Sequence, residues 1–187
     1  FIHPGVWLKN FAAASLAKAN GGIAINLIID SDLCRKSAIQ VPTGTAAKPY
    51  LDTIAYDKHD RELPFEESEI LRSDLWESFG HRTTKSLRPF VAHPIVSSWW
   101  AKSAIQSRST NNLGLALAQA RHLLEIEWGV KNWELPQSAV CQTESFRRFA
   151  TNMLTEAEQL RDAYNDSLDE YRATHRLRNL AQPMPNL

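Results

Sequence analysis

The chain opens with His3-Pro4-Gly5-Val6-Trp7 and continues through Gly21-Gly22 into the apolar run 23–29, which Asp30-Ser31-Asp32 follows directly. Pro4 suits the first position of a helix, because an N–H group there has no intrahelical partner to lose. Apolar residues then recur at helical spacing, and the glycine pair is typical of a helix end. The run 23–29 is too short for a second helix and is rich in β-branched residues. It therefore predicts a buried parallel strand.

A helix that leads into a parallel strand predicts an α/β fold with a ligand edge. In open α/β sheets, ligands bind at the carboxyl ends of strands and at helix N-termini. We expect four residues on this edge: His3, Gly5, Asp30 and Asp32. Gly5 would let a phosphate approach backbone N–H groups, His3 would donate a proton, and the aspartates would bind Mg²⁺, a ribose or a substrate amine. The alternatives are an ordinary helix start with a surface histidine, and a capping turn at residues 30–32.

Composition limits the class of protein. The 187 residues, 43% of them hydrophobic, suit one domain or one domain with a helical extension. Cys34 and Cys141 are too few for a disulfide framework, which favours a reducing, cytoplasmic location. No apolar run approaches the roughly 20 residues of a membrane span. The six histidines show no metal-ligand spacing, so we predict no metal site.

The zero net charge hides a segregation of acidic and basic residues. Nine carboxylates lie between residues 52 and 77, whereas none occurs between 78 and 124. The acid-free segment is therefore a candidate anion site. Its predicted phosphate-binding residues are Arg82, Lys85, Arg88 and Arg108. The alternative is that the acidic and basic segments simply lie against each other.

Periodicity predicts the remaining elements. We expect short strands over 38–41 and 53–56, helices over 66–79, 95–106 and 113–128, and an irregular or short-strand connection over 133–140. Asn111-Asn112 is expected to cap the third of these helices, and Thr143 to cap a last one. In that last helix, apolar residues recur every three or four positions, near a heptad period. They are Phe146, Phe149, Met153, Ala157, Leu160, Tyr164, Leu168 and Tyr171.

Three segments follow from this pattern. We expect a Rossmann-like α/β core with a parallel sheet over residues 1–142, a long amphipathic helix over 143–180 and a tail over 181–187. A helix that feeds a parallel strand normally follows a strand of its own, so we expect the N-terminal strand of this core to be missing. The proline-broken tail is typical of a connection to further protein. We therefore expect a fragment of a larger protein; a processed mature domain is the alternative.

The residues His3-Pro4-Gly5, the Gly21-Gly22 turn and the segment 24–32 resemble the opening of the cysteine-adding enzymes of bacillithiol synthesis and their uncharacterised bacterial relatives. The resemblance covers residues 1–42 and implies a Rossmann-like core similar to nucleotidyltransferases, with a long coiled-coil element used in dimers. His3-x-Gly5 is also similar to the first half of the nucleotidyltransferase His-x-Gly-His signature. Val6 stands where the second histidine would be, which argues against adenylyl transfer.

Two functions of different classes remain open. The first is a ligase- or transferase-type enzyme that binds a nucleotide or phosphorylated small molecule, with ATP or ADP and Mg²⁺ as the expected cofactors. Its catalytic residues would be His3, Asp30 and Asp32. The second is a non-catalytic scaffold that forms a homodimer through the helix 143–178. A nucleic-acid partner is disfavoured, because the basic residues are not interleaved with aromatic ones and the net charge is zero.

Overall fold

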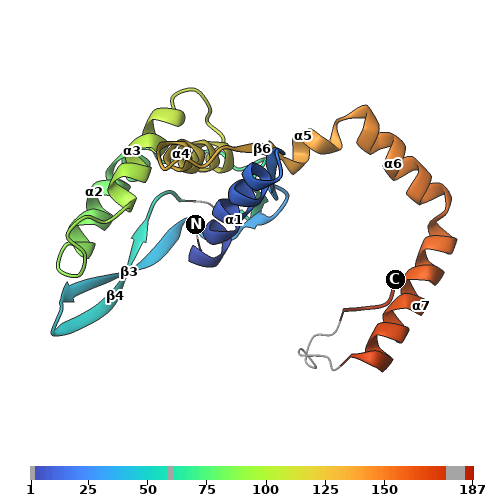
Figure 1. Ribbon diagram of the computed structural model, residues 1–187. Helices are drawn as coiled ribbons and strands as arrows, with labels where there is room; N and C mark the ends of the chain where they lie inside the picture. The colour runs from blue at the N-terminus through green and yellow to red at the C-terminus, as the bar shows by residue number, and fades with distance from the viewer. Residues whose placement is uncertain (1–2, 59–60, 176–183) are drawn as a thin grey trace. The chain divides into compact units, whose positions relative to one another are not determined.

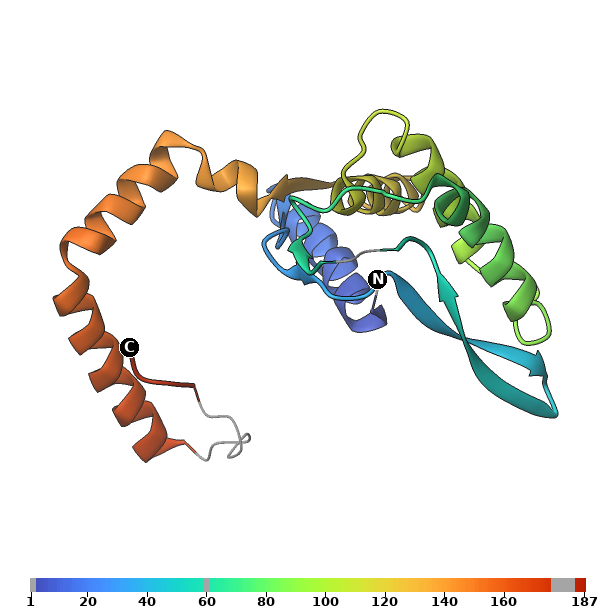
Figure 2. The same ribbon diagram turned by 180° about the vertical axis from the view of Figure 1, so that it is seen from behind.

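The computed structural model describes residues 3–58, 61–175 and 184–187. The chain divides into two compact units, Phe1–Ser138 and Ala139–Leu187. Figures 1 and 2 show the elements of both from opposite sides. The first unit has helices and strands, whereas the described secondary structure of the second is helical.

The first unit begins with the predicted helix and parallel strand. Helix α1 (Pro4–Ala19) starts after the N-cap residue His3, and Gly21 adopts a φ of 64° beyond its end. Strand β1 (Ala24–Ile28) pairs in parallel with β6 (Asn132–Pro136), a strand more than a hundred residues later in the chain. The structure thus confirms a mixed α/β fold with a parallel pair of strands.

The two faces of this parallel pair differ from the expectation of a buried strand. On one face, Ile25 lies opposite Trp133 and is 59% exposed, while Trp133 is 61% exposed. The other face, which is covered, presents Ala24, Asn26, Asn132 and Glu134. The prediction that the run 23–29 is buried on both faces is therefore wrong. Its large apolar side chains are exposed, and polar ones are enclosed.

The other strands form two antiparallel pairs. Strand β2 (Leu33–Cys34) pairs with β5 (Leu63–Pro64), and β3 (Ala38–Thr45) forms a hairpin with β4 (Lys48–Ala55). The predicted strands 38–41 and 53–56 both lie in this hairpin. Residues 42–45 extend β3 beyond the predicted strand 38–41. Each ladder within the described residues has two strands, so the larger sheet of a Rossmann-like core stays a prediction.

Three helices enclose the apolar core of this unit. They are α2 (Ser73–Leu87), α3 (Val96–Gln106) and α4 (Leu113–Glu127), and Figure 1 shows them grouped beside the hairpin. Trp100 lies at their centre, with ring centroids 4.5 Å from Trp76 and 4.2 Å from Phe79. Burial and the neighbouring Cys34 thiol raise the pKa of Tyr56, which packs on the same rings, above its ordinary value.

The expected helix 66–79 is displaced toward the C-terminus in the structure. The buried Asp57 carboxylate accepts hydrogen bonds from the backbone N–H groups of Leu71 and Arg72, which holds the preceding segment in a non-helical conformation. Gly80, the residue after the end of the predicted helix, lies inside α2. A Cβ atom there would be 2.8 Å from the Cβ of Trp100, so the glycine permits close packing of α2 on α3 rather than termination.

Helix α4 is fixed at its N-terminus by Asn112, as the sequence predicts. The Asn112 side-chain oxygen accepts a 2.7 Å hydrogen bond from the N–H of Leu115. Its amide nitrogen donates to the carbonyl oxygens of Phe65 and Glu66, each at 2.9 Å. One side chain therefore caps the helix and also attaches the loop that precedes α2.

The second unit contains the predicted C-terminal helix, interrupted once. A short helix α5 (Gln137–Cys141) spans the boundary between the units, and α6 (Glu144–Thr155) begins at its N-cap Thr143. Non-helical backbone at Glu156 separates α6 from α7 (Ala157–Thr174). The last residues of the predicted span 143–180 and the start of the tail lie outside the described residues. No residue of α6 or α7 is buried.

Residues 184–187 lie along α7, where the backbone N–H of Leu187 donates a 2.9 Å hydrogen bond to the side-chain oxygen of Asn165.

Within the described part of the chain, no helix combines the length and apolar character that crossing a bilayer requires.

We expect Asn112→Ala to lower the free energy of unfolding by about 1–2 kcal/mol, because it removes a helix cap and leaves two loop carbonyls without their donor. The neighbouring exposed Asn111 offers a matched control. Urea unfolding followed by circular dichroism measures both variants. Equal effects of Asn111→Ala and Asn112→Ala would contradict the assigned role of the cap.

Candidate functional site

A cavity of about 490 Å³ lies where the first turns of α1, the end of β1 and the middle of α4 meet. Its volume falls within the range of roughly 300–1,000 Å³ that is typical of small-molecule sites. The polar lining side chains are Asn10, Asn26, Asp32 and Arg121. Trp7 and Trp99 contribute aromatic surface. The cavity therefore combines flat apolar walls with a few polar groups.

The four residues expected at the α/β edge differ in their placement. Asp32 lines the cavity. Asp30 is engaged elsewhere in the fold, because its carboxylate accepts hydrogen bonds from the backbone N–H of Ser138, at 2.9 Å, and from the Ser138 hydroxyl. It fixes the end of β1 to the start of α5. Neither Asp30 nor His3 nor Gly5 belongs to the cavity lining.

The His3 ring already accepts a hydrogen bond from the Gly5 N–H group, which we expected a phosphate to contact. Its Nδ1 atom accepts a 3.1 Å hydrogen bond from the backbone N–H of Gly5. The N–H groups of Val6 and Trp7 both donate to the His3 carbonyl oxygen. The start of α1 thus caps itself, and a phosphate at this helix end would have to displace the histidine side chain.

The predicted phosphate-binding basic residues do not meet at this cavity. Arg82 has a structural role, since its guanidinium donates to the carbonyl oxygens of Ala55 and Leu75, at 2.6 and 2.9 Å. Lys85, Arg88 and Arg108 are exposed. None of the four lines the cavity. The basic residue in the lining is Arg121, which was not among the predicted phosphate-binding residues.

Arg121 is the centre of a polar network between α4 and β6. One guanidinium nitrogen donates to Glu125 Oε1 at 2.8 Å, and another donates to Glu134 Oε1. Asn10 Nδ2 also donates to Glu125 Oε1, and Asn26 Nδ2 to Glu134 Oε1, each at 2.9 Å. The network therefore joins α1, β1, α4 and β6 through side chains alone.

The Glu125 side chain is fully enclosed, with 0% of its surface exposed. Its second oxygen, Oε2, has no hydrogen-bond partner among the described residues. Ionised carboxylates are rarely buried unless they are paired and hydrogen-bonded, because desolvation is costly. Arg121 and Asn10 satisfy one half of this carboxylate and leave the other half without a donor.

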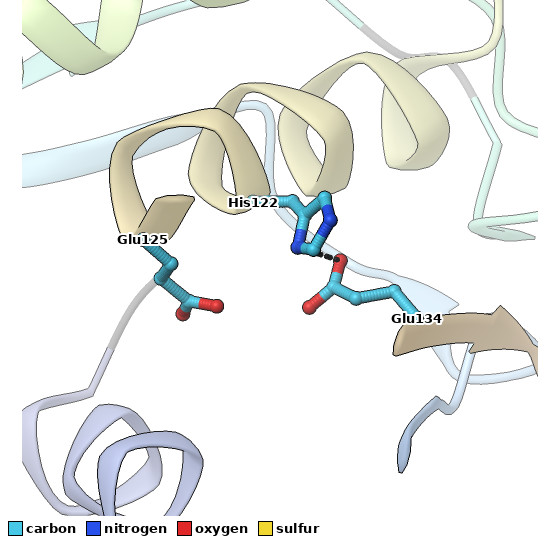
Figure 3. Close-up of side chains that lie close together, drawn as sticks. All are labelled: His122, Glu125 and Glu134. Carbon is cyan, nitrogen blue, oxygen red and sulfur yellow. Dashed lines mark ion pairs between the residues drawn. The ribbon is translucent and has the colours of Figure 1, made fainter. Parts of the chain in front are cut away.

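His122 lies beside the same two glutamates, as Figure 3 shows. Its Nδ1 atom is 3.9 Å from Glu134 Oε2 and has no hydrogen-bond partner among the described residues. His122 and Glu125 are three residues apart on α4, so they project from neighbouring positions on one helix face. One potential ligand atom from each of His122, Glu125 and Glu134 lies within 4.8 Å of the others.

Sequence reasoning did not identify this network. One signal was available, because Asn10, Asn26 and Glu125 each interrupt a segment that is otherwise apolar on its inward face. A polar residue at a core position requires a partner. The sequence alone does not show that the three positions meet, since that depends on the pairing of β1 with β6.

No family model matches the chain, and neither a curated protein nor a solved structure matches it.

We expect Arg121→Met to lower the free energy of unfolding by about 3–5 kcal/mol, because it leaves two enclosed carboxylates without their cation. Arg108→Met, at an exposed position, should change it by less than about 0.5 kcal/mol. Urea unfolding at neutral pH distinguishes the two variants. Comparable small effects would show that the buried ion pairs do not hold α4 on β6.

Proposed function

We propose that the first unit binds a small molecule with a flat ring and hydroxyl or amino groups, such as a nucleotide, and serves a ligase- or transferase-type enzyme. The observation that supports this is the cavity of about 490 Å³, in which two indole rings and one acidic side chain are placed together. Such a mixture is typical of ligand sites, where apolar walls provide affinity and a few polar groups fix orientation.

Asp32 is the polar group best suited to hold the ligand. It follows β1 at the carboxyl end of a parallel strand, the position at which α/β proteins commonly bind ligands. Its carboxylate can accept hydrogen bonds from ribose hydroxyls or pair with a substrate amine. Arg121, Asn10 and Asn26 donate to the two glutamates, so they support the wall of the cavity rather than offering free groups to a ligand.

The aromatic wall favours a planar ligand. Trp7 and Trp99 both line the cavity, and the Trp7 ring is held in place by Trp128, with ring centroids 5.0 Å apart. The Trp7 indole N–H has no hydrogen-bond partner among the described residues. A base or another flat ring beside Trp7 would gain stacking contact.

The phosphate of such a ligand fits less well inside the cavity than its ring or hydroxyl groups. Arg121 is already paired with two carboxylates, and an additional anion next to them would be repelled. We therefore place any phosphate outside the lining, toward the start of α1, where it replaces the His3 ring on the Gly5 N–H. Reaction would then depend on positioning rather than on a covalent step by the protein.

Ligand binding is expected to change the intrinsic tryptophan fluorescence and to raise the thermal unfolding temperature. ATP, ADP and AMP, each with and without Mg²⁺, are the ligands to titrate. Asp32→Asn should weaken binding by about 10- to 100-fold, because it removes a charged hydrogen bond worth about 1.5–3 kcal/mol.

Asp52→Asn, at an exposed position of β4, provides the matched control and should bind like the parent chain. A fluorescence or thermal response that Asp32→Asn leaves unchanged would show that the ligand does not bind in this cavity. No response to any of these nucleotides would contradict the nucleotide class.

One observation favours a second function, self-association through the C-terminal helices. No residue of α6 or α7 is buried, and large apolar side chains are exposed there. They are Phe149 at 57%, Leu154 at 77%, Leu160 at 38% and Tyr171 at 54%. Phe149, Leu160 and Tyr171 belong to the predicted set of apolar residues that recur every three or four positions, the pattern by which helices of two chains pair.

We expect sedimentation velocity over a concentration series to show a reversible homodimer. Leu160→Glu should weaken this dimer by at least tenfold, about 1.4 kcal/mol, because it buries a charge in the helix interface. Gln159→Glu adds the same charge at the adjacent exposed position and should leave the dimer intact. A monomer at every concentration, or equal effects of the two variants, would refute pairing through the exposed apolar residues of α6 and α7.

A further inference from the structure

We infer that His122, Glu125 and Glu134 form a binding site for one divalent transition-metal ion of the zinc type. This inference is independent of the nucleotide proposal, because it rests on a different set of side chains. The three residues come from α4 and β6, and each places a potential ligand atom within 4.8 Å of the other two. Figure 3 shows the two carboxylates directed toward each other, with the imidazole beside Glu134.

The hydrogen bonds of Arg121 separate the two oxygens of each carboxylate into different roles. The Oε1 atoms of Glu125 and Glu134 both accept from Arg121, and each also accepts from an asparagine. The Oε2 atom of Glu125 remains without a donor among the described residues, and that of Glu134 lies 3.9 Å from His122 Nδ1. The Arg121 guanidinium thus orients both carboxylates and leaves one oxygen of each for a ligand.

The enclosed oxygen of Glu125 is the observation that points to a ligand. Its side chain is completely buried, and a buried carboxylate oxygen without a donor is unfavourable unless a cation or a water meets it. His122 Nδ1 is likewise buried and without a hydrogen bond in the described structure. An unprotonated imidazole nitrogen and a carboxylate oxygen both offer lone pairs, so a metal ion satisfies both atoms together.

The net charge of the network around Arg121 favours the binding of a cation. Two glutamates and one arginine leave one negative charge in an enclosed network, since Glu134 is only 9% exposed and Arg121 14%. Arg121 donates to the Oε1 atom of each carboxylate and not to either Oε2 atom, so it leaves those second oxygens to a cation. Polar partners of this kind usually orient metal-binding carboxylates.

The donor set selects the class of metal. One imidazole and two carboxylates suit Zn²⁺ and related transition ions, whereas Mg²⁺ and Ca²⁺ prefer oxygen ligands alone. In a tetrahedral site with bonds of about 2.0–2.2 Å, ligand atoms lie roughly 3.4 Å apart. Three protein ligands leave a fourth position for water, as in catalytic zinc sites.

Isothermal titration of the full chain with Zn²⁺, after dialysis against a chelator, tests the site. We expect one ion per chain and a rise in the thermal unfolding temperature of about 5 °C at saturating Zn²⁺. His122→Ala should weaken binding by more than about 100-fold, because even indirect partners of metal sites contribute 10- to 100-fold. His81→Ala and His93→Ala, at exposed positions, are the matched controls and should bind like the parent.

Cobalt substitution keeps the inference testable if a variant does not fold. Co²⁺ bound by one nitrogen and carboxylate oxygens should give visible d–d absorption without a thiolate charge-transfer band, which excludes Cys34 and Cys141 as the ligands. Stoichiometric binding that His122→Ala abolishes, with this spectrum, supports the site. Absence of stoichiometric binding, binding unchanged by His122→Ala, or a thiolate band would overturn it.

Discussion

The guanidinium of Arg121 is the interaction on which the packing of α4 against the parallel pair β1 and β6 depends. It joins Glu125 on its own helix to Glu134 on β6, and through the shared carboxylates it also reaches Asn10 of α1 and Asn26 of β1. Four elements from both ends of this unit therefore meet at one charged group. Because a planar fork accepts only a narrow range of geometries, it fixes α4 over the parallel pair in one orientation.

This arrangement reverses the usual distribution of polarity in a parallel pair of strands. Such strands are normally apolar on both faces because helices cover both. Here the face beneath α1 and α4 holds Asn26, Asn132 and Glu134, while Ile25, Leu27, Trp133 and Leu135 are exposed on the other. Buried ion pairs seldom stabilise a fold more than apolar contacts would. This polar interior supports the binding roles that we propose for the unit.

The apolar core of the unit lies mainly between α2, α3 and α4. Trp76, Phe79 and Trp100 pack between α2 and α3 at ring distances of 4.2–4.5 Å, and Leu113, Ala116 and Ala120 of α4 complete the cluster. Helix α4 thus presents one face to the core and another to the polar network. The core positions the helix, and the helix positions Arg121, His122 and Glu125 toward β1 and β6.

The elements that could be predicted from the sequence are those whose start or end depends on neighbouring residues. Pro4 and the glycine pair set α1, Asn112 and Thr143 set the starts of α4 and α6, and the apolar run 23–29 set a parallel strand. The candidate site was predicted only at Asp32, because the edge of β1 can be inferred from chain order. The partners of Asp30 and Arg82 could not be inferred, since each depends on a residue far away in the sequence. Only the tertiary structure pairs β1 with β6, and that pairing decides which polar side chains meet.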